Sequence, residues 1–521
     1  MYRKYDLETK WKENKCILYI VIATVFFWGF LAHGYRFFQS DFTHDSLNEF
    51  SSAYGNDDWK IQLGRFVVPL YKEAFRTDLT LPWLIGILSL IWIGLSVFLI
   101  VKMFRVQSKG TIFLVAGIFT ANITVAATAA SFLHDLDCDM FALFCSVAAV
   151  YLWRQHGLGS LLGIVSIAIS LGIYQSYLSV TIVLVMLICI LDLLEERDWK
   201  LVLRDGIKAV VMILVGGVLY YVIMRIVLSV TGITLSSGGY NSLDKALELS
   251  VHNIGYLTAG AYRNSIFWLF NAFSTYPRML IKLATGCLIL IAAALIFLGF
   301  LRKEIGLPGK ILCIGFIVLL PVGMNITYIL TTGMVHELMV FGVWCAFLLI
   351  LIPLDRLTIV AKENKCAAIV RGACFLLVFV LLYGNVQTAN ALYLKKDMEQ
   401  EGFLSLMNRV LYRMEEVPEY ESGSTPVVFA GETNLLNDVI LGFEDYVSIN
   451  GMERSAVAGL QEDFRVRTYF QYVLNNPANI ADAAIWRTMQ EDPRVLAMPG
   501  YPREGCIQMV DGILVVKLGE K

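Results

Sequence analysis

The sequence predicts an all-α polytopic membrane protein with about eleven transmembrane helices and a small α/β domain at its C-terminal end. Hydrophobic residues make up 57% of the 521 residues and charged residues 17%, whereas soluble domains average about 45–50% and 25%. Apolar runs recur as far as about residue 390, and a more polar tail follows. We therefore divide the chain into a membrane domain, residues 1–390, and a tail domain, residues 391–521.

Runs of roughly 20 apolar residues are long enough to cross a bilayer as helices. The first run exceeds the core of a signal peptide and precedes no small-residue cleavage site, so we expect it to stay as an anchor. The expected spans are residues 16–38, 82–104, 110–132, 138–153, 158–174, 176–194, 208–230, 279–301, 310–330, 337–354 and 372–390.

Basic residues are distributed unevenly between the connections. The short turns 133–138, 174–177 and 331–337 carry no Lys or Arg, whereas the alternate connections are basic. Because Lys and Arg favour the cytoplasmic side, we expect a plasma-membrane protein with a cytoplasmic N-terminus and, after an odd number of spans, an extracytoplasmic tail. The inner basic residues include Lys102, Arg105, Lys109, Arg154, Arg197, Arg204 and Arg356.

Three outer segments are long: residues 39–81, residues 231–278 and the tail. The tail has polar helical stretches near 392–416 and 458–474 and a strand-like stretch at 425–431. It closes with two short apolar runs around Asp511-Gly512, a pattern typical of a β-hairpin. The tail therefore has the elements of a small α/β domain on the outer face.

The first outer loop, residues 39–81, begins with Asp41, His44 and Asp45 directly after the first span. Asp41 and Asp45 are four residues apart, so they share a face if this segment is helical. A carboxylate at the membrane surface is suited to act as a general base on a lipid-linked substrate, provided that its surroundings leave it ionised. The alternative is a solvated loop that is simply acidic.

A second acidic turn, residues 133–139, places Asp135, Asp137 and Asp139 at alternate positions. Their carboxylates are suited to binding a divalent cation or to accepting hydrogen bonds from sugar hydroxyls. The spacing matches no established metal-binding loop, and an ordinary polar turn is the third interpretation. A divalent cation therefore stays open as a cofactor, and no other cofactor is indicated.

Basic residues on the outer side are unexpected under the charge rule. They include Arg36, Arg65, Arg225, Arg263, Arg278 and Lys282. For Arg36 and Lys282 we expect side chains that extend to the interface. For Arg65 and Arg225 a phosphate partner and a structural ion pair are both open, and Arg225 falls inside a span, where a charge indicates a functional site.

Several function classes lack a signature in this sequence. The net charge of -2 gives no indication of nucleic-acid binding, and glycine-rich nucleotide loops and Ser/His/Asp arrangements are missing. Ten cysteines, mostly inside apolar runs, form no disulfide framework. One candidate function is a flippase for a polyprenyl-linked saccharide, but a flippase would be expected to have ionisable residues at mid-span depth in several helices. A polysaccharide polymerase is another candidate function.

The chain resembles the type II O-antigen glucosyltransferases, a family of the multi-spanning C-type glycosyltransferases (GT-C). The resemblance rests on His44-Asp45 after the first span and Gly64-Arg65-Phe66 before the second, which are similar to the Asp-Asp and Gly-Arg elements of that family. Two further segments are similar: residues 137–143, and the turn Tyr174-Gln175-Ser176-Tyr177. The sequence departs from the family at His44, where an acidic residue is commoner, and this makes Asp41 a competing candidate.

The resemblance implies a GT-C-like membrane domain that transfers a hexose, usually glucose, from a polyprenyl phosphate on the outer leaflet to a surface polysaccharide. It implies that Asp45, or alternatively Asp41, is the catalytic base of an inverting displacement. The expected partners are the donor lipid, the polysaccharide acceptor and the membrane. The residues expected to bind substrate are His44, Arg65, Asp135, Asp137, Asp139, Tyr174, Gln175, Arg225 and Arg278; the role of Arg225 follows from its charge alone.

Overall fold

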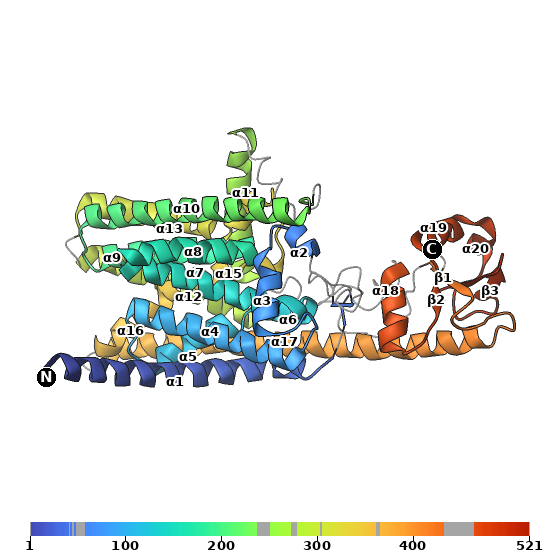
Figure 1. The fold of residues 1–521 in the computed structure, drawn as a ribbon. Coiled ribbons are helices and arrows are strands. Elements are labelled where there is room, and N and C mark those ends of the chain that lie inside the picture. The colour runs from blue at the N-terminus through green and yellow to red at the C-terminus, as the bar shows by residue number, and fades with distance from the viewer. Residues whose placement is uncertain are drawn as a thin grey trace.

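The computed structural model describes residues 2–40, 42–43, 46–47, 58–155, 157–236, 251–271, 279–302, 305–360, 365–431 and 463–519. Most of these residues are helical, and a small sheet forms near the C-terminus. The helices pack as an elongated bundle, with the sheet beyond one end and the N-terminus at the other (Figure 1). We name these the sheet-facing end and the N-terminal end of the bundle.

The bundle is built from α-helices joined by short 3-10 turns. Its first half comprises α1 Tyr2–Phe37, α2 Asp58–Gln62, α3 Val67–Phe75, α4 Pro82–Phe104, α5 Lys109–Thr120, α6 Ile123–Ser131, η2 Leu133–Asp135, α7 Leu136–Gln155 and α8 Leu158–Ile173. Its second half comprises η3 Gln175–Tyr177, α9 Leu178–Leu194, α10 Trp199–Thr231, α11 Val251–Phe270, α12 Met279–Arg302, α13 Leu307–Met324, α14 Ile326–Leu330, η5 Glu337–Met339, α15 Phe341–Cys345, α16 Leu348–Val360 and α17 Lys365–Glu415.

Nine helical stretches among the described residues are long and apolar enough to span a membrane. They coincide with nine of the eleven predicted spans, so the predicted count of eleven is not confirmed. The predicted span 158–174 forms α8, which has 16 residues, and the span 337–354 is divided among η5, α15 and α16. Most of residues 340–354 are buried by protein, and a helix can be interrupted at membrane depth where protein surrounds it.

The third predicted span is interrupted as well, between α5 and α6. Asn122 occupies the break and caps α6, because its side-chain oxygen accepts from the Val125 amide over 3.1 Å. Its Nδ2 donates to the carbonyl of Ile118 at the end of α5 over 2.9 Å. One side chain thereby satisfies backbone groups on both sides of the interruption, as an enclosed helix end requires.

The sheet at the C-terminus has the strand order β2-β1-β4-β3. Its strands are β1 Pro426–Ala430, β2 Asn479–Ile480, β3 Ile507–Val510 and β4 Ile513–Lys517, and its helices are α18 Asp463–Thr468, α19 Ala483–Glu491 and α20 Pro493–Ala497, with a π-helical turn at Tyr469–Val473. β1 pairs in parallel with β2 and β4, whereas β3 and β4 form the predicted antiparallel hairpin. Asp511 and Gly512 both have positive φ, 52° and 80°, as a two-residue hairpin turn of type I′ requires.

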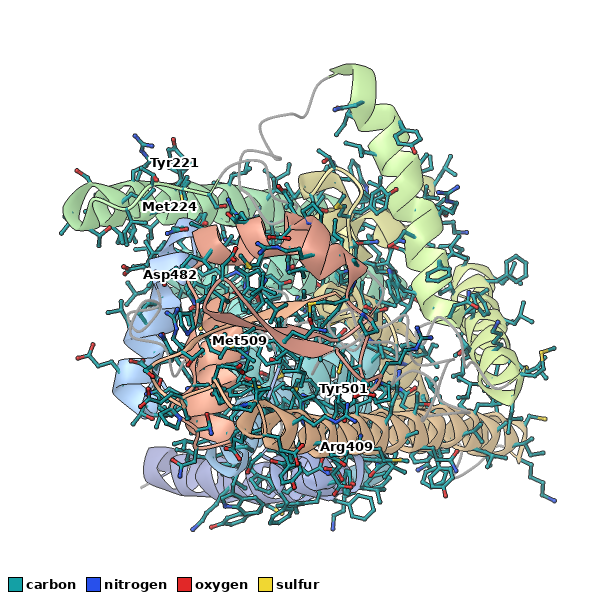
Figure 2. The ribbon with its side chains drawn as sticks, turned by 90° about the vertical axis from the view of Figure 1, so that its right-hand side faces the viewer. Tyr221, Met224, Arg409, Asp482, Tyr501 and Met509 are labelled. Atoms are coloured by element: carbon teal, nitrogen blue, oxygen red, sulfur yellow. The ribbon has the colours of Figure 1, made fainter. Side chains whose placement is uncertain are left out.

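The long helix α17 connects the bundle to the sheet. It contains 51 residues, so the predicted span 372–390 and the predicted polar helix 392–416 form one continuous helix. The polar half of α17 supplies Phe403, Leu406 and Met407 to the hydrophobic core beneath the sheet. Viewed toward the sheet-facing end, the C-terminal elements that carry Asp482 and Met509 stand in front of the bundle (Figure 2).

A buried polar contact joins α1, α5 and α17 within the bundle. The two ring nitrogens of His33 lie 2.7 Å from Tyr393 Oη and 2.9 Å from the Thr120 carbonyl oxygen. His33 and Tyr393 are both fully buried, so water cannot replace a lost partner.

We expect Tyr393→Phe to lower the free energy of unfolding by about 1–2 kcal/mol, because it leaves one ring nitrogen of His33 without a partner. Tyr383→Phe on the same helix is the control, since the Tyr383 side chain is 49% exposed. Denaturant titration in detergent measures both variants. Equal losses in the two variants would contradict a specific role for the His33 contact.

Candidate functional site

Two short helices of the first long loop pack against the start of α7. Lys60 of α2 forms an ion pair with Asp135. Arg76, at the end of α3, donates from Nε to Asp137 Oδ2 over 2.9 Å and from Nη2 to the His134 carbonyl oxygen. All four charged side chains are buried. The two ion pairs therefore join the first loop to the second acidic turn.

Burial makes each of these pairs sensitive to the loss of one partner. A charge removed from water is costly unless an opposite charge and further hydrogen bonds compensate for it. Burial lowers the pKa of Lys60, and the Asp135 carboxylate opposes that shift. The Lys60 ammonium also lies 3.8 Å from the ring centroid of Trp59, a cation–π contact that contributes to holding the charge.

A glycine turn after α2 sets the position of Arg65. Gly64 has a φ of 74°, and its amide donates to the Ile61 carbonyl over 2.9 Å while the Arg65 amide donates to the Lys60 carbonyl over 2.8 Å. This is the Schellman arrangement, in which a residue of positive φ ends a helix. The turn reverses the chain between α2 and α3 and keeps Arg65 close to Lys60.

The Arg65 side chain reaches the predicted turn Tyr174-Gln175. Its guanidinium lies 4.3 Å from the ring centroid of Tyr174, and its buried Nε has no hydrogen-bond partner. Gln175 Nε2 donates to the Leu63 carbonyl over 3.3 Å and contacts Tyr220 Oη at 3.1 Å. The structure thus brings three predicted site residues, Arg65, Tyr174 and Gln175, into one contact group.

Asp139 differs from the two aspartates that precede it. It lies in the first turn of α7 and is 6% exposed, but its carboxylate makes no hydrogen bond or ion pair with any residue that the structure describes. Arg65 and Lys60 are the cations that act on it electrostatically. Asp139 therefore has a carboxylate available to a ligand, whereas Arg76 contacts both oxygens of Asp137 and Lys60 contacts Oδ2 of Asp135 but leaves Oδ1 without a partner.

Three buried cations at this end were not among the predicted site residues: Lys60, Lys72 and Arg76. Lys72 is completely buried and acts electrostatically on Asp135. The signal that finds them is the same one that indicated Arg65, because all four are basic residues in a segment predicted to lie outside. The first loop therefore supplies a group of four cations: Lys60, Arg65, Lys72 and Arg76.

Four predicted residues lie outside the part of the chain that the structure describes: Asp41, His44, Asp45 and Arg278. Arg225 is described, and it is exposed on α10 near Tyr221 and Met224, which are labelled in Figure 2. Its side chain makes no hydrogen bond or ion pair with any described residue. The structure therefore does not join Arg225 to the group around Arg65, and its role stays a prediction.

Residues on both sides of His44-Asp45 are buried. The Thr43 amide donates to Ser46 Oγ over 2.7 Å and the Ser46 amide donates to Thr43 Oγ1 over 3.2 Å. Leu47 belongs to the hydrophobic core beneath the C-terminal sheet, and Gln400 of α17 donates to the Phe42 carbonyl. The chain around the predicted base is thus held by the polar half of α17 and by the C-terminal core.

Arg36 differs from its expected position. The sequence predicts a side chain that extends to the membrane interface, but Arg36 is 1% exposed. Its Nε donates to the Ala129 carbonyl over 2.9 Å and its Nη1 donates to the Gln39 carbonyl over 3.3 Å. Because α6 supplies a carbonyl partner within reach, the guanidinium is stabilised inside the protein without reaching the interface.

The described residues contain no group of three or more His, Cys, Asp or Glu side chains arranged to hold a metal ion. In the acidic turn, Asp135 and Asp137 point to different cations, Lys60 and Arg76. A positively charged neighbour competes with a metal ion for the same carboxylate. The described part of this turn is therefore organised by ion pairs.

Comparison with known proteins identifies a family. The family model described as Glucosyl transferase GtrII matches residues 34–353, which include the first loop, the acidic turn and the Tyr174-Gln175 turn. No curated protein and no solved structure shows a significant match to the chain.

We expect Arg76→Gln and Asp137→Asn each to lower the free energy of unfolding by about 3–5 kcal/mol, because each leaves a buried charge without its partner. The double variant should lose less than the sum of the two single losses. Arg494→Gln, which removes exposed pairs with Asp492 and Asp511, should cause a much smaller loss. Denaturant titration measures the cycle, and strict additivity would show that Arg76 and Asp137 do not depend on each other.

Proposed function

Because the chain belongs to the GtrII glucosyl transferase family and is a multi-pass membrane glycosyltransferase, we propose a specific reaction for it. In this reaction the protein transfers glucose from a polyprenyl phosphate to a cell-surface polysaccharide. The observation that carries the proposal is the group of buried cations and carboxylates at the sheet-facing end, all of whose described members lie within the matched residues 34–353. A phosphate-linked sugar needs both kinds of group in one site.

The proposed orientation puts the sheet-facing end outside the cytoplasm. The opposite, N-terminal end of the bundle carries Arg105, Arg154, Arg197 and Arg356 in its connections and helix ends. An excess of basic residues at one end favours the cytoplasm for that end. The donor lipid then presents its phosphate and sugar at the outer leaflet, level with the start of α7.

Arg65 is the proposed ligand of the donor phosphate. Guanidinium groups bind phosphate through paired, charge-assisted hydrogen bonds. The buried Nε of Arg65 lacks a hydrogen-bond partner, and the stacking on Tyr174 fixes the plane of the guanidinium. Lys60 and Lys72 add positive charge nearby, which stabilises the leaving phosphate as negative charge develops on it.

Asp45 is the proposed general base, and Asp41 is the alternative. The base takes the proton of an acceptor hydroxyl while that oxygen attacks the anomeric carbon. The bond from this carbon to the phosphate oxygen breaks in the same step, so the configuration inverts and polyprenyl phosphate leaves with the bonding electrons. Asp139, whose carboxylate has no described partner, is the proposed hydrogen-bond acceptor for a sugar hydroxyl.

Two other activities, transport and polymerisation of a polyprenyl-linked saccharide, use a related lipid. Membership of a glucosyl transferase family favours transfer of a single sugar over both. The group formed by Lys60, Arg65 and Arg76 with the acidic turn lies at one end of the bundle, as a reaction at the membrane surface requires.

Asp45→Asn should reduce glucose transfer by about 100- to 10,000-fold, because an amide keeps the shape of the side chain but cannot take up the proton. The assay is transfer of label from polyprenyl-phosphate-glucose in proteoliposomes, with the crude surface polymer of the host as acceptor. Asp41→Asn is measured in parallel. If Asp45→Asn stays active and Asp41→Asn does not, the base is Asp41; if both stay active, the base is neither residue.

Arg65→Gln should raise the apparent KM for the donor by about tenfold or more, because one charge-assisted contact to phosphate is lost. Arg65→Lys should recover part of the loss, since it restores the charge without the planar group. Arg225→Ala tests the second predicted phosphate ligand in the same assay. An unchanged donor KM in Arg65→Gln would exclude Arg65 from phosphate binding, and the same result in Arg225→Ala would exclude Arg225.

A further inference from the structure

A second charged site lies at the N-terminal end of the bundle. A cavity of about 240 Å³ is lined there by side chains from α4, α7, α9 and α16 and from the connection between α9 and α10. It is remote from the candidate active site: along α7, the 17 residues from Asp137 to Arg154 correspond to roughly 25 Å. A ligand in this cavity therefore cannot reach the group around Arg65.

Ion pairs fix two of the guanidiniums in this cavity. Arg154 Nη1 and Nη2 donate to the two oxygens of Asp192 over 2.6 and 2.7 Å. Arg197 donates to Asp192 over 2.7 Å and to Asp205 over 2.5 Å. Asp192 thus holds Arg154 and Arg197 side by side, and each retains N–H donors beyond those used by the carboxylates.

A third guanidinium, that of Arg356, is oriented by backbone carbonyls. It donates to the Phe104 carbonyl over 3.0 Å and to the Arg105 carbonyl over 3.3 Å, and it lies 3.4 Å from Glu195. These contacts tie α16 to the end of α4. The adjacent Asp355 accepts from the amides of residues 107 and 108, so the whole connection after α4 is fixed.

Arg105 is the fourth guanidinium, and it differs from the other three. Its side chain makes no hydrogen bond or ion pair with any residue that the structure describes. Its backbone is in the left-handed region, with a φ of 53°, a conformation that glycine or asparagine would adopt at less cost. Arg105 is exposed at the end of α4, so its guanidinium is available to an anion that enters the cavity.

We propose that this cavity binds a phosphate group. Its lining has four guanidiniums but only two carboxylates, Asp192 and Glu195, and Asp205 pairs with Arg197 from outside the lining, so positive charge remains in excess, as an anion site requires. Met103, Ile188 and Ile352 form apolar walls beside the guanidiniums, and such a mixture suits a lipid head group. The same chemistry accepts inorganic phosphate, so both sources are tested. The inference is independent of the proposed donor and base.

The test uses the full chain in nanodiscs of phosphatidylcholine, with or without a minor fraction of phosphatidic acid, a phosphomonoester lipid. Inorganic phosphate added to the neutral nanodiscs forms the second arm. We expect one of these ligands to raise the Tm of the wild type. Arg105→Gln should need about tenfold more of it for the same rise, because one charge-assisted contact is lost. If only phosphatidic acid raises the Tm, the ligand is a lipid head group. If inorganic phosphate also raises it, the cavity accepts a free phosphate as well.

Two further variants make the result specific. Lys200→Gln removes an exposed charge of α10 that does not line the cavity, and it should respond like the wild type. Arg105→Lys should respond more strongly than Arg105→Gln. The proposal is overturned if neither ligand raises the Tm of the wild type, if Arg105→Gln responds like the wild type, or if Lys200→Gln loses the response equally.

Discussion

The sheet-facing end of this membrane protein depends on buried pairs of opposite charge. Lys60 and Arg76 enter the bundle from a loop, and they are stabilised there by Asp135 of η2 and by Asp137 in the first turn of α7. Neither partner is tolerable alone in that environment. This constraint fixes α2 and α3 on α7, and these two helices in turn position Arg65 beside Tyr174.

The same arrangement explains which parts of the site the sequence could predict. Asp135, Asp137 and Asp139 were visible because they are close together in the chain, and Arg65 because it is basic in an outer segment. The pairing of Lys60 with Asp135 joins residues 75 positions apart, and local spacing contains no information about such a contact. The hairpin around Asp511-Gly512 was predictable for the opposite reason, since its determinants are adjacent.

The sequence predicted the helices whose formation depends only on the length of an apolar segment. Nine predicted spans have helical counterparts of sufficient length, whereas residues 158–174 and 337–354 do not. Hydropathy records how apolar a segment is, but it does not distinguish a lipid-facing helix from a segment enclosed by protein. The break at Asn122 is satisfied by its own side chain, and residues 340–354 are enclosed by protein; hydropathy alone gives no sign of either.

The length of α17 determines how far the tail domain lies from the membrane. A helix of 51 residues extends about 76 Å, of which a bilayer core occupies about 30 Å. The remainder extends beyond the bundle and contributes to the core beneath the sheet, so one continuous helix fixes the distance between the bundle and the sheet. If the sheet-facing end lies outside the cytoplasm, as proposed, a polymer chain that approaches from the cell surface would meet this domain before it meets the membrane.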